Sequence, residues 1–425
     1  KNPLWYAAKW GGFQDYNASG TPDQKNEWDK DDDGVPDTYF YVQNPLRLEE
    51  QLNRSFADIL RRTASGTAAS VISQTRSGEG AVYQAVFYPE FKGPLGNTIN
   101  WAGELHALFV DSYGNMREDT NGNAIMDPVD DLVIEFDGTT IYKYQDTDGD
   151  DIIEDTQTPV YTGSIDDIAF IWSSSAILNE MSDGEIASQR IYNTASSNRY
   201  IFTFIDQNRN MVADTGEQMD FLSSATPSAA DLTDDSLIYP YLTLFPTFED
   251  EPSIVFDGSA ISMDAFRTGN SSEFVDFLSN QSQRVINYIR GIDQPEFISA
   301  AMPAYILPPF RSRQADYDDD GTMETWRLGD IVYSTPTVVG RPAENYHLLY
   351  RDTSYAVFAD KFRNRRNVVY AGANDGMFHA FNAGFYDEAT KSFSTQLTTE
   401  TSHELGAELW AYVPFNLLQI GRAHV

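Results

Sequence analysis

One short acidic pattern occurs five times along the 425-residue chain. Each copy places an oxygen-bearing side chain at positions 1, 3, 5 and 9. Ca²⁺ is bound by about 6–8 oxygen atoms at roughly 2.3–2.6 Å, and alternate residues of a tight loop can direct their side chains toward one point. The pattern therefore predicts several bound calcium ions, up to five. The copies are DKDDDGVPD from Asp29, DTNGNAIMD from Asp119, DTDGDDIIE from Asp146, DQNRNMVAD from Asp206 and DYDDDGTME from Asp316.

Each loop is named below by the number of its first residue. The predicted side-chain ligands are Asp29, Asp31, Asp33 and Asp37; Asp119, Asn121, Asn123 and Asp127; Asp146, Asp148, Asp150 and Glu154; Asp206, Asn208, Asn210 and Asp214; and Asp316, Asp318, Asp320 and Glu324. Position 7 would supply a backbone carbonyl, and an apolar side chain there can point inward. The residues at position 7 are Val35, Ile125, Ile152, Val212 and Thr322. The alternative is an acidic turn without metal, because Asp, Asn and Gly favour turns in any case.

Two positions distinguish these loops from the calcium loop of helix–loop–helix sensors. Position 12, which is acidic in the sensors, is acidic only in the 119 and 206 loops, as Asp130 and Glu217. Glycine at position 6, which permits a sharp turn, is present only as Gly34 and Gly321. We therefore expect structural calcium loops that do not switch and that differ in affinity.

The net charge of −35 restricts the partners that this chain can bind. It argues against nucleic acid and against electrostatic docking on anionic lipid. There is no cysteine, so disulfides and thiolate chemistry are excluded, and calcium loops could act as the cross-links instead. Their need for roughly micromolar to millimolar Ca²⁺ points to a location outside the cytoplasm. No run of about 18 apolar residues is present, so no membrane-spanning segment is predicted.

The first 45 residues are rich in Trp, Tyr, Gly and Asp, and we expect them to be irregular. Apolar residues at helical spacing predict amphipathic helices over Leu48–Leu60 and Ser272–Ile289. We expect two domains: residues 1–75, a helical segment with one calcium loop, and residues 76–425, a β domain with an insertion around 215–290. The chain starts at Lys1 without methionine, so we expect a processed protein or a fragment.

From about residue 80 the apolar residues alternate with a period of two, which predicts β-strands. The predicted strands are Val82–Phe87, Glu104–Val110, Leu132–Phe136, Thr140–Gln145, Tyr200–Ile205, Asp330–Val339, Tyr355–Phe358, Val368–Ala371, Met377–Phe381 and Leu409–Val413. Asp137-Gly138 and Asp375-Gly376 predict hairpin turns. Many short strands at this spacing favour a sandwich or a propeller over a parallel α/β sheet.

The sequence contains none of the common catalytic motifs. GxSxG, GxxxxGK, GxGxxG and HExxH are all absent. The histidines are scattered: His106, His347, His379, His403 and His424. A single histidine on a strand, such as His379, is more often a hydrogen-bonded core residue than a catalyst. We therefore predict a protein that is not an enzyme.

Four stretches together resemble the PilY/PilC family of type IV pilus tip-associated adhesins. They are Leu4–Phe13 (LWYAAKWGGF), Trp101–Asn123 (WAGELHALFVDSYGNMREDTNGN), Trp326–Gly340 (WRLGDIVYSTPTVVG) and Asn367–Ala383 (NVVYAGANDGMFHAFNA). The resemblance implies a mainly β protein with a C-terminal antiparallel β-propeller. This chain would hold the opening blades, and we expect it to be truncated at its C-terminus.

The same resemblance implies a cell-surface protein that is secreted through the periplasm and acts at the pilus tip. The implied partners are minor pilins, and the implied roles are pilus biogenesis, surface adhesion to an unknown ligand and twitching motility. Family members carry a regulatory calcium site in the propeller, which we assign to none of the five loops.

Two alternatives to the pilus-associated role remain open. Val368–Phe381 (VVYAGANDGMFHAF) also resembles the blade repeats of quinoprotein dehydrogenases, whose propellers hold Ca²⁺. However, the vicinal disulfide common in that class cannot form without cysteine. The other alternative is a calcium-stabilised structural module of a surface layer or stalk, which would bind neighbouring copies of itself.

Overall fold

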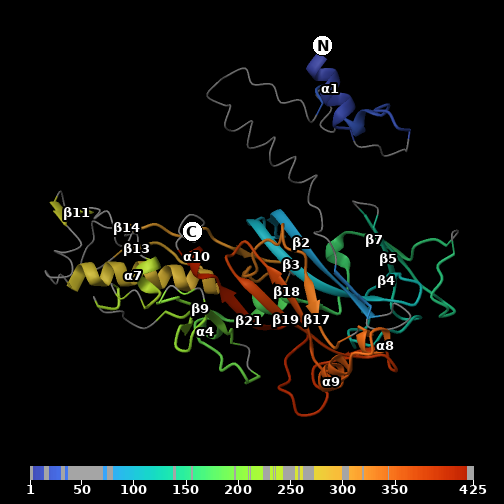
Figure 1. The fold of residues 1–425 in the computed structure, drawn as a ribbon. Helices are drawn as coiled ribbons and strands as arrows, with labels where there is room; N and C mark the ends of the chain where they lie inside the picture. Colours follow the sequence, from blue (N-terminus) through green and yellow to red (C-terminus); the bar gives the residue numbers. More distant parts are fainter. Residues whose placement is uncertain are drawn as a thin grey trace. The chain divides into compact units, whose positions relative to one another are not determined.

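The computed structural model describes residues 3–13, 19–29, 34–36, 70–73, 80–136, 140–154, 157–195, 198–208, 210, 212–223, 230–232, 234, 236–242, 254–256, 259–261, 272–298, 306–317, 320–342 and 344–418 (Figure 1). The chain divides into two compact units, residues 1–64 and 65–425. The predicted boundary at 75/76 lies within residues 74–79, outside the described ranges, and stays a prediction.

The first unit contains a helix where irregular structure was expected. Helix α1 (Pro3–Gly11) begins with proline, whose fixed φ suits the first turn of a helix. Its Trp5 is buried and packs edge-on against Trp28, with the ring centroids 5.5 Å apart. A short 3-10 turn, η1 (Lys25–Glu27), precedes the 29 loop. The expectation of an irregular start is therefore wrong for these residues, and the predicted helix Leu48–Leu60 lies outside the described ranges.

The second unit begins with an eight-stranded sheet in which every pair is antiparallel. The strands follow chain order from β1 to β7, and β8 pairs with β3. Their bounds are β1 Ser70–Ser73, β2 Gly80–Lys92, β3 Thr98–Val110, β4 Met116–Arg117, β5 Val133–Phe136, β6 Ile141–Tyr144, β7 Tyr161–Gly163 and β8 Trp172–Ser173. The longest pair is β2 and β3, which lie side by side in Figure 1.

A second sheet of seven strands has the order β10-β9-β21-β19-β18-β17, and β20 pairs with β19. The bounds are β9 Ile201–Phe204, β10 Gln218–Asp220, β17 Thr337–Val339, β18 Asn367–Gly372, β19 Phe378–Asp387, β20 Ser392–Ser394 and β21 Glu408–Val413. All pairs are antiparallel except β21 with β9, which is parallel. A strand from before the long helix α7 is thereby joined to strands that follow it.

Helices and short hairpins lie between the strands of the two sheets along the chain, and α3 and α4 join the first sheet to the second. The helices are α3 Ser174–Glu180, α4 Asp183–Ile186, α5 Tyr239–Leu242, α7 Ser272–Arg290, α8 Tyr346–Leu349, α9 Thr353–Lys361 and α10 Phe415–Leu418, with the 3-10 turn η3 Ile165–Asp167. The hairpins are β11 Ile254–Phe256 with β12 Ser259–Ile261, β13 Phe297–Ile298 with β14 Ile306–Leu307, and β15 Gln314–Ala315 with β16 Glu324–Thr325.

The predicted strands are present except in two places, and α7 confirms the predicted helix Ser272–Ile289. The prediction of a strand at Tyr355–Phe358 is wrong, because these residues lie in α9. The Asp352 carboxylate caps this helix by accepting hydrogen bonds from the backbone N–H groups of Ser354 (2.9 Å) and Tyr355 (3.1 Å). A short aromatic run does not distinguish a strand from a helix by its periodicity alone.

The second error lies in the predicted strand Asp330–Val339, of which only β17 is extended within a sheet. Pro336 has no N–H group to donate to a ladder. The Asp330 carbonyl instead accepts a hydrogen bond from the N–H of Asn374 (2.9 Å), in the turn between β18 and β19. The hairpin signal Asp375-Gly376 is confirmed in that turn, where Gly376 has φ +88°.

The two sheets share one hydrophobic core. Tyr83, Leu105 and Phe109 from β2 and β3 cluster with Val369 and Phe381 from β18 and β19, and all five are buried. A separate core lies between α7 and the β9–β21 edge of the second sheet. These cores fix the positions of the loops that leave the strand ends.

The chain is mainly β, with antiparallel sheets and few helices. Among the described residues the strands form open sheets and close into no barrel or propeller, so the predicted propeller is unconfirmed. No helix within the described ranges is long and apolar enough to cross a membrane.

Candidate metal centre

Four of the predicted loops follow the ends of strands. The 119 loop connects β4 to β5, the 146 loop follows β6, and the 206 loop connects β9 to β10. The 316 loop connects β15 to β16, and the 29 loop follows η1 in the first unit. Each loop therefore starts from a backbone that pairing or helical turns already fix.

The first aspartate has the same local role in every loop: its carboxylate accepts hydrogen bonds from backbone N–H groups three to five residues later. The N–H donors are Gly34 to Asp29 (2.8 Å), Asn123 and Ala124 to Asp119 (3.1 and 2.8 Å), Gly149 and Asp151 to Asp146 (both 2.8 Å), Asn210 to Asp206 (3.1 Å), and Gly321 to Asp316 (3.2 Å). These bonds turn the backbone around the carboxylate, so the later side chains of the loop return toward it.

The sixth residue is left-handed in the four loops where it is described. Glycine takes this conformation at Gly34 (φ +81°) and Gly321 (φ +85°). Ala124 (φ +56°) and Asp151 (φ +65°) also adopt it, although a side chain makes it unfavourable by about 1–2 kcal/mol. The missing glycines therefore do not abolish the sharp turn.

The left-handed turn can be tested at Ala124. Replacing Ala124 with valine is expected to lower the free energy of unfolding by more than about 1 kcal/mol, because a β-branched side chain is strongly disfavoured at positive φ. Replacement with glycine should be tolerated. Denaturant unfolding measures both variants, with Ile125→Val at the exposed neighbouring position as the control. Equal stability of the valine and glycine variants would exclude the left-handed turn.

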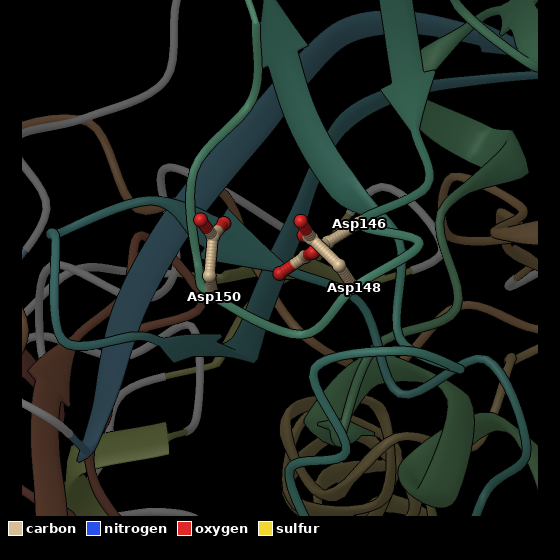
Figure 2. Close-up of side chains that lie close together, drawn as sticks. All are labelled: Asp146, Asp148 and Asp150. Carbon is tan, nitrogen blue, oxygen red and sulfur yellow. The ribbon is translucent and has the colours of Figure 1, made fainter.

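The 146 loop brings three carboxylates together. Asp146, Asp148 and Asp150 each offer an oxygen atom, and these atoms all lie within 4.8 Å of one another. Figure 2 shows the three side chains rising from the one loop that follows β6. Asp146 is buried whereas Asp148 and Asp150 are exposed, and the ninth residue, Glu154, is exposed and outside this group. Three converging carboxylate oxygens are a suitable partial ligand set for Ca²⁺.

A buried arginine joins the 146 loop to the 119 loop. Arg117, at the end of β4, is fully buried. Its guanidinium donates to the carboxylates of Asp111 (2.9 Å), Asp146 (2.9 Å) and Asp151 (3.2 Å). It also donates to the backbone carbonyls of Pro128 (2.7 Å) and Asp131 (3.0 Å) in the 119 loop. Sequence reasoning missed Arg117, whose role depends on partners up to 34 residues away.

Arg117 also affects the ionisation of the 146 loop. Burial acts to raise the pKa of Asp146, but hydrogen bonds from the Gly149 N–H and from Arg117 outweigh it and hold this pKa below its usual value. Asp146 is therefore kept in the ionised form that a cation requires.

The acid that closes the 119 loop is Asp131, one residue after the predicted Asp130. Asp130 is exposed, whereas Asp131 is buried and accepts hydrogen bonds from the N–H groups of Thr120 (3.0 Å) and Asp127 (2.8 Å). Burial raises the pKa of Asp131 to about 6, and the nearby carboxylates of Asp119 and Asp127 add to this effect. Asn121 and Asn123 direct their side-chain oxygens at backbone N–H groups of the loop.

In the 206 loop, side chains near the end of the loop form hydrogen bonds with residues near its start. Glu217 is buried and accepts hydrogen bonds from the N–H groups of Gln207 (3.1 Å) and Asp214 (2.8 Å). The side-chain amides of Asn208 and Asn210 both donate to the same oxygen of Asp214, at 2.7 and 2.8 Å. Four predicted ligands of this loop thus lie within hydrogen-bonding distance of one another or of the loop backbone.

The 316 loop contains a buried carboxylate oxygen without a hydrogen bond. Asp316 is completely buried, and its Oδ1 has no hydrogen-bond partner among the described residues, while its Oδ2 accepts from Gly321. The β15–β16 pair places Ala315 opposite Glu324, so positions 1 and 9 of the loop are close. A buried anionic oxygen is costly unless a cation or donor compensates it, so this loop fits a bound cation. Asp318 lies outside the described ranges.

In the 29 loop the structure describes only part of the predicted set. Asp29 is buried and forms an ion pair with Lys25 (3.4 Å) in addition to its bond with Gly34. Asp31, Asp33 and Asp37 lie outside the described ranges.

The side chains at position 7 do not point inward, contrary to expectation. They are exposed in all five loops, at Val35, Ile125, Ile152, Val212 and Thr322. The turn around the first aspartate directs these side chains to solvent. The apolar side chains at this position are therefore not packed into the interior of their loops.

Outside the loops, His379 confirms the expectation of a hydrogen-bonded core residue. It is fully buried on β19, with Nδ1 2.8 Å from Glu408 and Nε2 3.2 Å from Asp375. Glu408 in turn accepts two hydrogen bonds from the buried Arg199, at 2.6 and 2.7 Å. Both ring nitrogens therefore face carboxylates, which leaves no free lone pair for a general base or a metal.

The protein is expected to lose stability between pH 6.5 and about 9 through His379. Burial lowers its pKa, but Asp375 and Glu408 outweigh this and raise it to about 9 from 6.5. A histidine with a raised folded-state pKa stabilises the protein below its unfolded pKa and loses this contribution as the pH rises through the folded value. Chemical denaturation across this range should show the decline, which His379→Gln should flatten. A wild-type free energy of unfolding that stays unchanged up to pH 9 would contradict a His379 pKa raised by Asp375 and Glu408.

Proteins with established names match parts of the chain. The type IV pilus biogenesis factor PilY1 homologue of Xylella fastidiosa is 31% identical over 142 residues, which is 33% of this chain and 10% of that protein. PilY1 from two strains of Pseudomonas aeruginosa is 32% identical over 98 residues and 35% identical over 83 residues. These matches cover 22% and 19% of this chain, and 8% and 7% of those proteins.

The matched stretches span a tenth or less of the relatives' own length. No protein-family model matches the chain, and no solved structure matches it. The similarity over these partial stretches nevertheless supports the resemblance to PilY1-like proteins. Over part of its length, this chain is similar to proteins named type IV pilus biogenesis factor PilY1.

Proposed function

We propose that this chain is part of a calcium-stabilised type IV pilus biogenesis protein without catalytic activity. The observation that carries the proposal is the 31% identity over 142 residues to the PilY1 homologue of Xylella fastidiosa. By this proposal the protein lies at the cell surface, at the pilus tip, after secretion through the periplasm. It contacts minor pilins and supports adhesion and twitching motility.

Calcium is the proposed cofactor of the five loops. Two features of the loops support this proposal: the three converging carboxylates of the 146 loop, and the buried Oδ1 of Asp316 that lacks a hydrogen bond. Bound ions would supply positive charge at these oxygens and would tie each loop to the strand or turn from which it starts. The proposed role of the ions is structural.

The proposed β-propeller would be built from blades that resemble the second sheet. Strands β17, β18, β19 and β21 form a run of neighbouring strands, of which β18 and β19 are joined by a tight turn. Four-stranded antiparallel sheets of this kind are the repeating unit of propellers. Small-angle X-ray scattering of the full-length protein would test for a compact disc-shaped domain.

The role in pilus biogenesis is tested by deleting the gene in its own organism. The expected result is loss of surface pili in electron micrographs and loss of twitching zones on agar. Complementation with the wild-type gene should restore both. Normal piliation and motility in the deletion strain, with the protein absent by immunoblot, would contradict the proposed function.

A further inference from the structure

A cavity of about 640 Å³ lies where several separate parts of the second unit meet. Its walls come from the start of β3, the end of α7, the segment before β15, the segment after β16, the β18–β19 turn and α10 with the end of β21. The volume falls within the range of roughly 300–1,000 Å³ typical of small-molecule sites. None of the predicted calcium ligands lines it.

One wall of the cavity is an aromatic ring held by an unusual backbone. Trp101 lines the cavity and is 41% exposed, although it lies within β3 next to the buried Ala102. Its φ is +58°, a left-handed value that costs a bulky residue about 1–2 kcal/mol. Strained residues persist only where the surrounding structure holds them, and they cluster at active sites and ligand clamps.

Three planar polar groups line the cavity together with the aromatic ring. Asp330 is buried, and one of its carboxylate oxygens accepts a hydrogen bond from the side-chain amide of Asn374 (2.6 Å). Arg311 is exposed; its backbone carbonyl accepts a hydrogen bond from the Tyr288 hydroxyl (3.0 Å), while its guanidinium has no hydrogen bond or ion pair with the described residues. All three side chains line the same cavity as Trp101. Together they offer both donors and acceptors in fixed planes.

The remaining charges of the cavity are already engaged. Arg313 donates to Asp293 (3.1 Å) and lies over the ring of Tyr288, and Arg327 donates to backbone carbonyls of α3. Asp375 pairs with His379. One positive group, Arg311, and one negative group, Asp330, therefore line the cavity without an ion pair among the described residues, and the nearby charge of Arg311 acts on Asp330. A matched pair favours a neutral ligand over an anion or a cation.

A neutral ligand that has many donors and acceptors and one apolar face is a sugar. Each hydroxyl both donates and accepts, which suits the carboxylate, the amide and the guanidinium. The C–H face of a pyranose ring packs on an aromatic face such as that of Trp101. We propose that this cavity binds a neutral carbohydrate through Trp101, Arg311, Asp330 and Asn374. This inference rests on the proposed adhesive function, for which it names the class of ligand.

The test uses the purified 425-residue chain with its calcium, labelled with a fluorophore, on an array of neutral and acidic oligosaccharides. Neutral glycans are expected to bind, and isothermal titration with the best of them should give the affinity. Trp101→Gly keeps the positive φ favourable while removing the ring, and Arg311→Ala removes a group that the fold does not use. Each should weaken binding about tenfold or more. Tyr350→Ala, a 75% exposed aromatic residue on another surface, should bind as the wild type does.

Several outcomes would overturn the proposal: no glycan binding, a preference for acidic glycans or peptides, or unchanged affinity in both pocket variants. Melting curves of the variants establish whether they are folded.

Failure of the proposed glycan binding can be distinguished from failure of the proposed pilus function. A strain carrying Trp101→Gly should assemble pili normally but lose attachment to a surface coated with the bound glycan, whereas failure of the pilus role would appear in the deletion strain.

Discussion

Replacing Arg117 with methionine is expected to lower the free energy of unfolding by about 3–5 kcal/mol. The arginine is fully buried and donates five hydrogen bonds: two to the 119 loop, two to the 146 loop and one to Asp111 in the turn between β3 and β4. Methionine fills a similar volume but leaves the carboxylates of Asp111, Asp146 and Asp151 close together without their cation. Removing one partner of a buried charge network lowers the stability far more than replacing the whole network with apolar residues, because the remaining charges stay buried without compensation.

The measurement is urea unfolding of the wild type, Arg117→Met and a control, Arg363→Met. The Arg363 side chain is 72% exposed and pairs only with the exposed Asp360 among the described residues, so its loss should change stability by less than about 0.5 kcal/mol. Added Ca²⁺ should recover part of the stability lost in Arg117→Met, since the 146 loop would then bind a compensating cation. A loss below about 1 kcal/mol would show that Arg117 does not hold the two loops together.

Replacing Gly103 with alanine is expected to destabilise the second unit by at least about 3 kcal/mol. A Cβ at Gly103 would lie 1.9 Å from the carbonyl oxygen of Gly329, and contacts below 3.0 Å are essentially never observed. The backbones approach this closely because the Gly103 N–H donates to the Leu328 carbonyl (3.0 Å). A Cβ at Gly329 would in turn lie 2.5 Å from the backbone N of Asp375. The two glycines thus join the first sheet to the β18–β19 turn of the second.

The matched control is Gly184→Ala in α4, where the nearest atom to a new Cβ would be 4.0 Å away. That change should leave stability unchanged or raise it by up to about 1 kcal/mol, because alanine favours a helix. Both variants are compared by thermal and urea unfolding. If Gly103→Ala melts at the wild-type temperature, the two sheets do not meet through this backbone contact.

Several strands were predictable because one face is more deeply buried than the other. In β9 and β18 buried residues alternate with half-buried ones, and the buried members Ile201, Val369 and Ala371 lie in the cores. The strand prediction at Tyr355–Phe358 was wrong because the spacing of this short aromatic run does not distinguish a strand from a helix. The helix found there depends on the Asp352 cap. The strand prediction for the segment after Asp330 was wrong because the Asp330 carbonyl accepts a hydrogen bond from the backbone N–H of the distant residue Asn374.

The candidate site was only partly predictable for a similar reason. The spacing of aspartates located the loops, because the first carboxylate and the turn it organises are local. Arg117 and Asp131 were missed, since their roles depend on neighbours that folding brings together. The cavity around Trp101 could not be predicted, because Arg311, Asp330 and Asn374 reach it from other parts of the chain.

Calcium binding by the purified chain tests the central claim most directly. Inductively coupled plasma mass spectrometry should find several calcium ions per chain, up to five. Millimolar Ca²⁺ should raise the melting temperature by more than about 5 °C over the EDTA-treated protein. Chelation should reverse the shift, and Mg²⁺ should not reproduce it, because it requires a smaller octahedral site. Absence of bound calcium together with an unchanged melting temperature in millimolar Ca²⁺ would contradict the account.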